Sequence, residues 1–113
     1  MCSSDLVDAA WKTGTAELGY GDSPVDEATI VEDNPTPGYN VADTDRYVTT
    51  YFRKTFTVTD AHRVTNVAVS LKYDDAGIVY INGTQVLITS GLTAGAAYNT
   101  LSTANAEDRK SVV

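Results

Sequence analysis

Tyr51-Phe-Arg-Lys-Thr-Phe-Thr-Val58, followed by Asp74-Asp-Ala-Gly-Ile-Val-Tyr-Ile-Asn-Gly-Thr-Gln-Val86, decides the fold of this chain. The first stretch alternates apolar and polar residues as a strand does. The second enters a turn at two aspartates and then predicts a hairpin closed by Asn82-Gly83, because a two-residue type I′ loop needs residues that tolerate positive φ. Together they predict an all-β fold, an antiparallel jelly-roll β-sandwich.

The first predicted strand covers residues 47–58, with apolar side chains on one parity. Lys54 falls on that parity, so either a bulge resets the register there or the lysine lies at a rim with its amine in water. Residues 65–73 alternate cleanly and give the most regular strand pattern in the chain. Further elements are predicted at 28–31, 78–81, 84–88 and 97–101 (short strands), at 60–63 (a turn), and at 22–45 and 90–97 (loops).

Composition fits one acidic, strand-rich domain. The chain has 113 residues, seven of them Tyr and one Met, and a net charge of −7. An acidic domain repels phosphate backbones and anionic lipid, so we expect no nucleic-acid partner and no membrane-surface partner. We find no apolar run long enough to span a bilayer and no secretory signal in the first residues.

The two ends resemble translated short-read sequencing adapters. The ends are Met1-Cys-Ser-Ser-Asp-Leu6 and Asp108-Arg-Lys-Ser-Val-Val113. Adapter DNA would encode these strings if GTG served as the start codon, and its next codon would be a stop. We therefore expect one partial β-sandwich domain at 7–107 within a longer gene, with non-native tails at 1–6 and 108–113. Ordinary frayed ends are the alternative.

Several strings resemble the galactose-binding-like jelly-roll domains of large secreted bacterial proteins, and also the sugar-binding domain of family-two glycoside hydrolases. They are Trp11, Leu18-Gly-Tyr-Gly-Asp22, Thr49-Thr-Tyr-Phe-Arg-Lys-Thr-Phe56, Asp74-Asp75 and Val79-Tyr-Ile-Asn-Gly83, and the likeness covers nearly all of residues 10–106. The resemblance implies a secreted or cell-surface location beside a catalytic domain.

Two departures from that family stand out. Ala76 precedes Gly77, where the family places glycine directly after the aspartates, and the family's closing strands beyond Glu107 are missing. A sandwich without those strands would expose an edge and part of its core. We therefore predict that this chain is poorly soluble or marginally folded, with its last strands missing.

No catalytic constellation is present in the sequence, and we expect no enzyme activity. His62 is the one histidine and lies in a polar turn, so it forms no triad or zinc site. Asp74 and Asp75 are adjacent, so on a strand they would point to opposite faces and could not act as a glycosidase pair. We assign them, with Asn82 and Gly83, a structural role in turns.

Candidate ligand contacts are aromatic and amide residues at predicted loops or strand ends, since aromatic faces stack on sugar rings. The acidic loop is also a candidate structural calcium (Ca2+) site, although a solvated loop is the default, and no other cofactor is expected. The candidate ligand residues are Tyr20, Tyr39, Asn40, Tyr47 and Tyr98, and the candidate metal ligands are Asp22, Asp26 and Glu27.

These observations predict a non-catalytic accessory module that binds carbohydrate beside a hydrolase domain in a secreted bacterial protein. The alternative is a structural spacer that packs against a neighbouring catalytic domain and has no ligand of its own.

Overall fold

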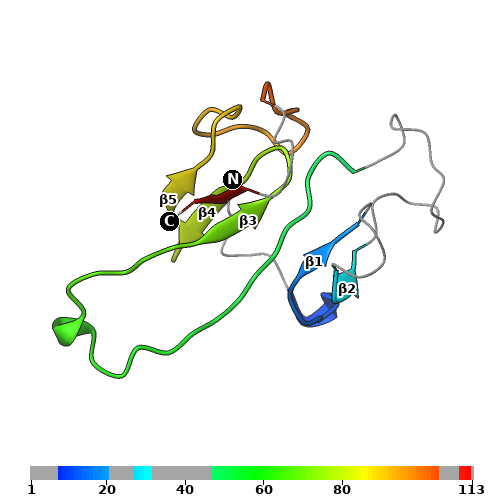
Figure 1. The fold of residues 1–113 in the computed structure, drawn as a ribbon. Helices are drawn as coiled ribbons and strands as arrows, with labels where there is room; N and C mark the ends of the chain where they lie inside the picture. The colour runs from blue at the N-terminus through cyan, green and yellow to red at the C-terminus, as the bar shows by residue number, and fades with distance from the viewer. Residues whose placement is uncertain (1–7, 21–26, 32–46, 105–109, 113) are drawn as a thin grey trace. The chain divides into compact units, whose positions relative to one another are not determined.

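The computed structural model describes residues 8–20, 27–31, 47–104 and 110–112 (Figure 1). The chain divides into two units, with the boundary between Thr50 and Tyr51. The described residues are rich in strands and contain no α-helix, which confirms the all-β class but not the jelly-roll arrangement. The elements are η1 (Asp8–Ala10), β1 (Leu18–Gly19), β2 (Thr29–Ile30), η3 (Ala61–Arg63), β3 (Leu71–Tyr73), β4 (Ile78–Ile81), β5 (Thr84–Ile88) and β6 (Lys110–Val112).

In the first unit, β1 and β2 form a short parallel pair. Thr29 holds this pair together: its amide donates to the Glu17 carbonyl at 3.0 Å and its hydroxyl donates to the Thr15 carbonyl at 2.8 Å. Gly14 packs closely against the Thr29 side chain, because a Cβ added at Gly14 would lie 2.9 Å from the Thr29 Cβ. The short strand predicted at 28–31 is confirmed at β2.

In the second unit, β4 and β5 form the predicted antiparallel hairpin. Asn82 and Gly83 make up its two-residue loop, with φ of 49° and 79°, the positive values that a type I′ turn requires. The register shifts between Val79 and Tyr80, which pair with Leu87 and Gln85. Val86 is therefore the extra residue of a β-bulge in β5.

Gly77 and Thr89 close the other end of the hairpin. The Thr89 amide donates to the Gly77 carbonyl at 3.0 Å, and the Gly77 amide donates to the Thr89 hydroxyl oxygen at 2.9 Å. Thr89 is the one buried polar residue in the described part of the chain. The hairpin is therefore tied by hydrogen bonds at both its turn and its base.

β3 pairs in antiparallel fashion with β6, with Leu71 opposite Val112 and Tyr73 opposite Lys110. The β6 residues belong to the stretch for which the sequence predicted a non-native tail. Between β3 and β4 the chain bends at the two aspartates, and Asp75 has a φ of 59°. A turn therefore lies where the sequence placed one.

Residues 90–104 form a loop of successive turns, so the short strand predicted at 97–101 is wrong. The Thr100 amide donates to the Ala97 carbonyl at 2.9 Å within one of these turns. The Thr103 amide donates to the Gly91 carbonyl at 3.0 Å and draws the loop back onto its start. The glycine and alanine residues of this stretch favour turns over a strand, because they supply little side-chain surface to a ladder.

The strand predicted at 47–58 is also wrong, and the strand predicted at 65–73 is confirmed only at β3. Residues 51–70, which we call the open loop, run out to η3 and return to β3 (green in Figure 1). Phe52 and Phe56, which fall on the apolar parity of the predicted strand, are 58% and 65% exposed, and Lys54 is exposed with them. A strand pattern becomes a strand only where a partner pairs with it, and no ladder forms here among the described residues.

The predicted turn at 60–63 is present as η3. The Asp60 carboxylate caps it by accepting a hydrogen bond from the His62 amide at 3.1 Å. Across the described residues the strands make three separate two-stranded ladders, and no large side chain is fully buried. No helix in the described ranges is long and apolar enough to cross a membrane.

Candidate functional site: an apolar groove

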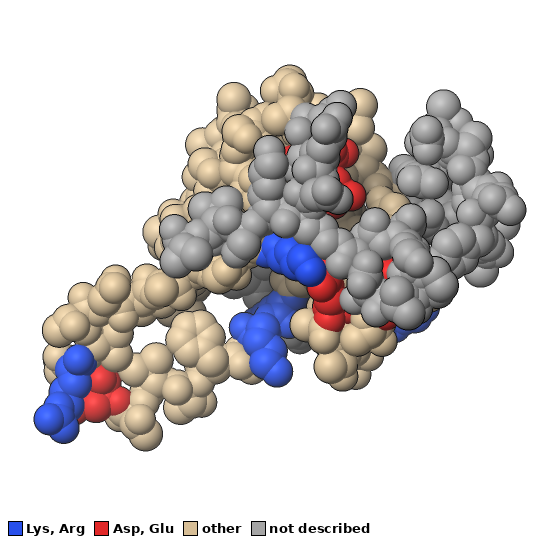
Figure 2. Space-filling view, viewed as in Figure 1, with Lys and Arg blue, Asp and Glu red and all other residues tan. Residues whose placement is uncertain are grey.

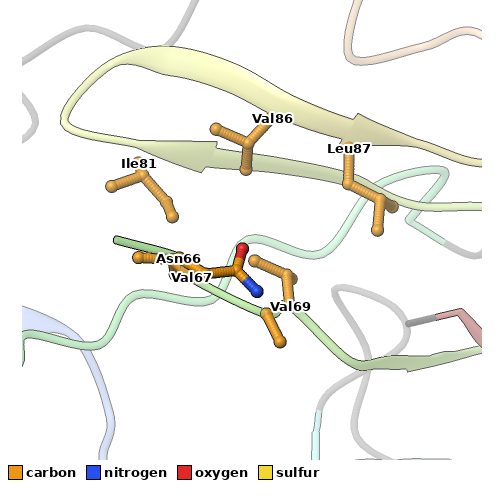
Figure 3. A pocket seen from close by; sticks show the side chains of 7 residues that line it. Asn66, Val67, Val69, Ile81, Val86 and Leu87 are labelled. Carbon is orange, nitrogen blue, oxygen red and sulfur yellow. The ribbon is translucent and has the colours of Figure 1, made fainter. Parts of the chain in front are cut away.

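An open groove of about 470 Å³ lies between the hairpin and the returning arm of the open loop. Figure 3 shows the hairpin side chains on one side, pointing toward the residues of the open loop on the other. The hairpin contributes Ile81, Val86 and Leu87, and the open loop contributes Asn66, Val67, Ala68 and Val69.

The bulge explains why two consecutive residues of β5 line the same groove. In a regular strand, neighbouring side chains point to opposite faces. The extra residue breaks this alternation, so Val86 and Leu87 both point toward the groove in Figure 3. Bulges re-aim side chains in this way, and the period-two pattern of the sequence did not indicate it.

The groove is apolar and partly open to water. Val67 is 56% exposed and Val86 is 47% exposed, whereas Val69, Ile81 and Leu87 are half-buried. Among the described residues that line it, Asn66 is the one with a polar side chain and none is charged. Such a surface can accept the apolar side chains of a partner.

None of the predicted ligand-binding residues is among the described residues that line this groove. Tyr98 is in the turn-rich loop of the second unit and is 71% exposed, while Tyr20, half-buried, and Tyr47, exposed, belong to the first unit. Tyr39 and Asn40 lie outside the described residues. An aromatic platform for sugar stays a prediction.

The predicted metal ligands give no site within the described residues. Glu27 is half-buried just before β2, and Asp22 and Asp26 lie outside the described ranges. In the part of the chain that the structure describes, no three His, Cys, Asp or Glu residues cluster in a way that could hold a metal ion. The calcium site stays a prediction.

The turn residues occupy the places that the sequence gave them. Asn82 and Gly83 form the hairpin loop, and Asp74 and Asp75 are exposed in the bend that follows β3. Trp11, part of the family resemblance, is half-buried in the first unit.

Comparisons of this chain with protein-family models, with curated proteins and with solved structures gave no match.

Proposed function

We propose that this chain is a non-catalytic accessory module that packs its apolar groove against neighbouring polypeptide, with a jelly-roll β-sandwich as its complete fold. The observation that carries this proposal is a groove lined by six apolar residues on two separate segments, with two of its valines about half exposed. Apolar side chains that are gathered in a groove and partly exposed to water gain free energy when a partner covers them. The resemblance to accessory domains of secreted bacterial hydrolases supports a catalytic domain as the neighbour.

The energetics favour such packing. Full burial of a valine side chain is worth about 1.5–3 kcal/mol, so covering the exposed half of Val67 and of Val86 contributes about 1 kcal/mol each. No charged side chain is among the described residues that line the groove, so a partner would desolvate the Asn66 amide and backbone polar groups there, but no charge.

A longer protein from the source gene, including the adjoining domain, tests this role. Val86→Lys puts a charge into the groove at an exposed position, and we expect it to lower the melting temperature of the adjoining domain. Val58→Lys, at a similarly exposed valine outside the groove, should leave that temperature unchanged. Equal melting temperatures for the Val86 variant and the parent protein would contradict the proposal.

Carbohydrate binding is the second candidate, and the exposure of Tyr98 favours it. A solvent-exposed aromatic face in a loop can stack on a sugar ring. Pull-down of the chain on a panel of polysaccharides, with and without calcium, tests this activity. We expect retention that Tyr98→Ala abolishes and Tyr80→Ala, at a partly exposed tyrosine of β4, preserves. No retention on any polysaccharide would count against it.

A further inference from the structure

Residues 64–69, which we call the uncharged segment, have a composition suited to pairing with themselves. The sequence is Val64-Thr-Asn-Val-Ala-Val69, without charge, glycine or proline, and four of its six residues are β-branched. Short segments with high β-propensity and low net charge are those that pair between chains when they are exposed.

The structure leaves this segment outside any described ladder. Residues 64–68 are exposed, including Val64 at 43% and Val67 at 56%, and Val69 is half-buried. The segment leads, through one residue, into β3, which pairs with β6. Of the strand predicted at 65–73, only residues 71–73 are therefore paired, and the residues before them have no described strand partner. An unpaired backbone edge of this kind can pair with another chain.

We propose that two copies of this chain associate by antiparallel pairing of the uncharged segment with itself about a two-fold axis. With Val67 on the axis, Thr65 faces Val69 and Asn66 faces Ala68 of the other copy. This register keeps Val67 and Val69 of both copies on one face, because residues of the same parity then share a side of the ladder. A pairing of this kind is closed, since each copy uses the same patch.

Pairing of two copies along the segment sets no charged side chains of residues 64–69 against each other, because these residues carry no charge. Each chain carries a net charge of −7, but the uncharged segment contributes nothing to it. Arg63 and Lys72 flank the segment, and Figure 2 shows basic and acidic side chains together at η3, next to its start. In the proposed register Arg63 and Lys72 do not face each other, so the ladder sets no like charges of this pair opposite one another.

Sedimentation velocity of the full chain over a range of concentrations tests the pairing. We expect a shift from monomer to dimer as the concentration rises. Val67→Lys places two lysines opposite each other on the axis and should weaken dimerisation roughly tenfold or more. Val58→Lys is the matched control, since Val58 is similarly exposed in the open loop but lies outside both the segment and the groove, and it should dimerise as the parent chain does.

Two further measurements remove ambiguity. Circular dichroism of the variants should match that of the parent, so that loss of the dimer is not loss of folding. Amide exchange should show protection at residues 65–69 that increases with concentration.

A chain that stays monomeric at every concentration would overturn the inference. So would a Val67→Lys variant that dimerises normally, or assemblies that grow beyond two copies. The pairing goes beyond the proposed function and does not depend on it. The proposed packing of the groove is tested by the melting temperature of the adjoining domain in the Val86→Lys variant. The proposed pairing is tested by the dimerisation of the Val67→Lys variant of the chain alone.

Discussion

Replacing Thr89 by valine removes the hydrogen bond that closes the base of the hairpin and keeps the shape of the side chain. The Gly77 amide then loses its acceptor at 2.9 Å in a half-buried place, while the main-chain bond from the Thr89 amide at 3.0 Å remains. A typical hydrogen bond contributes about 1 kcal/mol net, and a buried donor left without an acceptor costs about 1–3 kcal/mol. Since Gly77 is half-buried and water reaches it in part, we expect a loss of about 1–2 kcal/mol.

Urea unfolding followed by circular dichroism measures the free energy of unfolding, and amide exchange at Gly77 reports the bond itself. Thr89→Ser is the control, because it keeps the hydroxyl and should retain the protection of the Gly77 amide. Thr89→Val should lower that protection roughly tenfold, which corresponds to 1.4 kcal/mol. If Thr89→Val left both the unfolding free energy and the exchange rate unchanged, the hydrogen bond from the Gly77 amide to the Thr89 hydroxyl would not stabilise the hairpin.

The remaining predictions concern the turns. Gly91→Ala should destabilise the chain by about 2–4 kcal/mol, because φ is +92° and the new Cβ would lie 2.8 Å from the backbone nitrogen of Ala104. Gly95→Ala, at φ +76° with open space around it, should cost about 1–2 kcal/mol. Thermal melts of the two variants compare these losses, and equal losses would refute the role of the contact at Gly91. Gly83→Ala should also cost about 1–2 kcal/mol by the same melt, from backbone conformation alone, since nothing lies within 4 Å of the added Cβ. Asp60→Ala should increase amide exchange at η3 with less than about 1 kcal/mol lost overall, because the cap is exposed, and unchanged exchange there would contradict the capping role.

Local chemistry made the hairpin predictable. Asn82-Gly83 specifies its loop through the backbone of two adjacent residues, and the bends at Asp75 and Asp60 follow from the same kind of local preference. The strands at 47–58 and 65–73 were over-predicted because alternation states which side chains would be buried, but not whether a second strand is present to pair with them. The predicted strand at 47–58 also crosses the boundary between the two units.

The candidate site was predictable only in part. Alternation in 65–73 indicated that Val67 and Val69 share a face, and both line the groove. Val86 was missed because a bulge in β5 depends on the register of the pair of strands, which no single strand encodes. The tyrosines were chosen for their chemistry and their expected loops, and such reasoning cannot place residues from different segments near one another.

The bulge in β5 also affects how sequences related to this one should be compared. A hairpin of the same topology that lacks the extra residue would be one position shorter between its turn and its base. Its apolar residues would then be out of phase with those of this chain on one side of Val86. Such a pair should be aligned with a single-residue gap at that position, because an ungapped alignment would match inward-facing with outward-facing positions and hide the likeness.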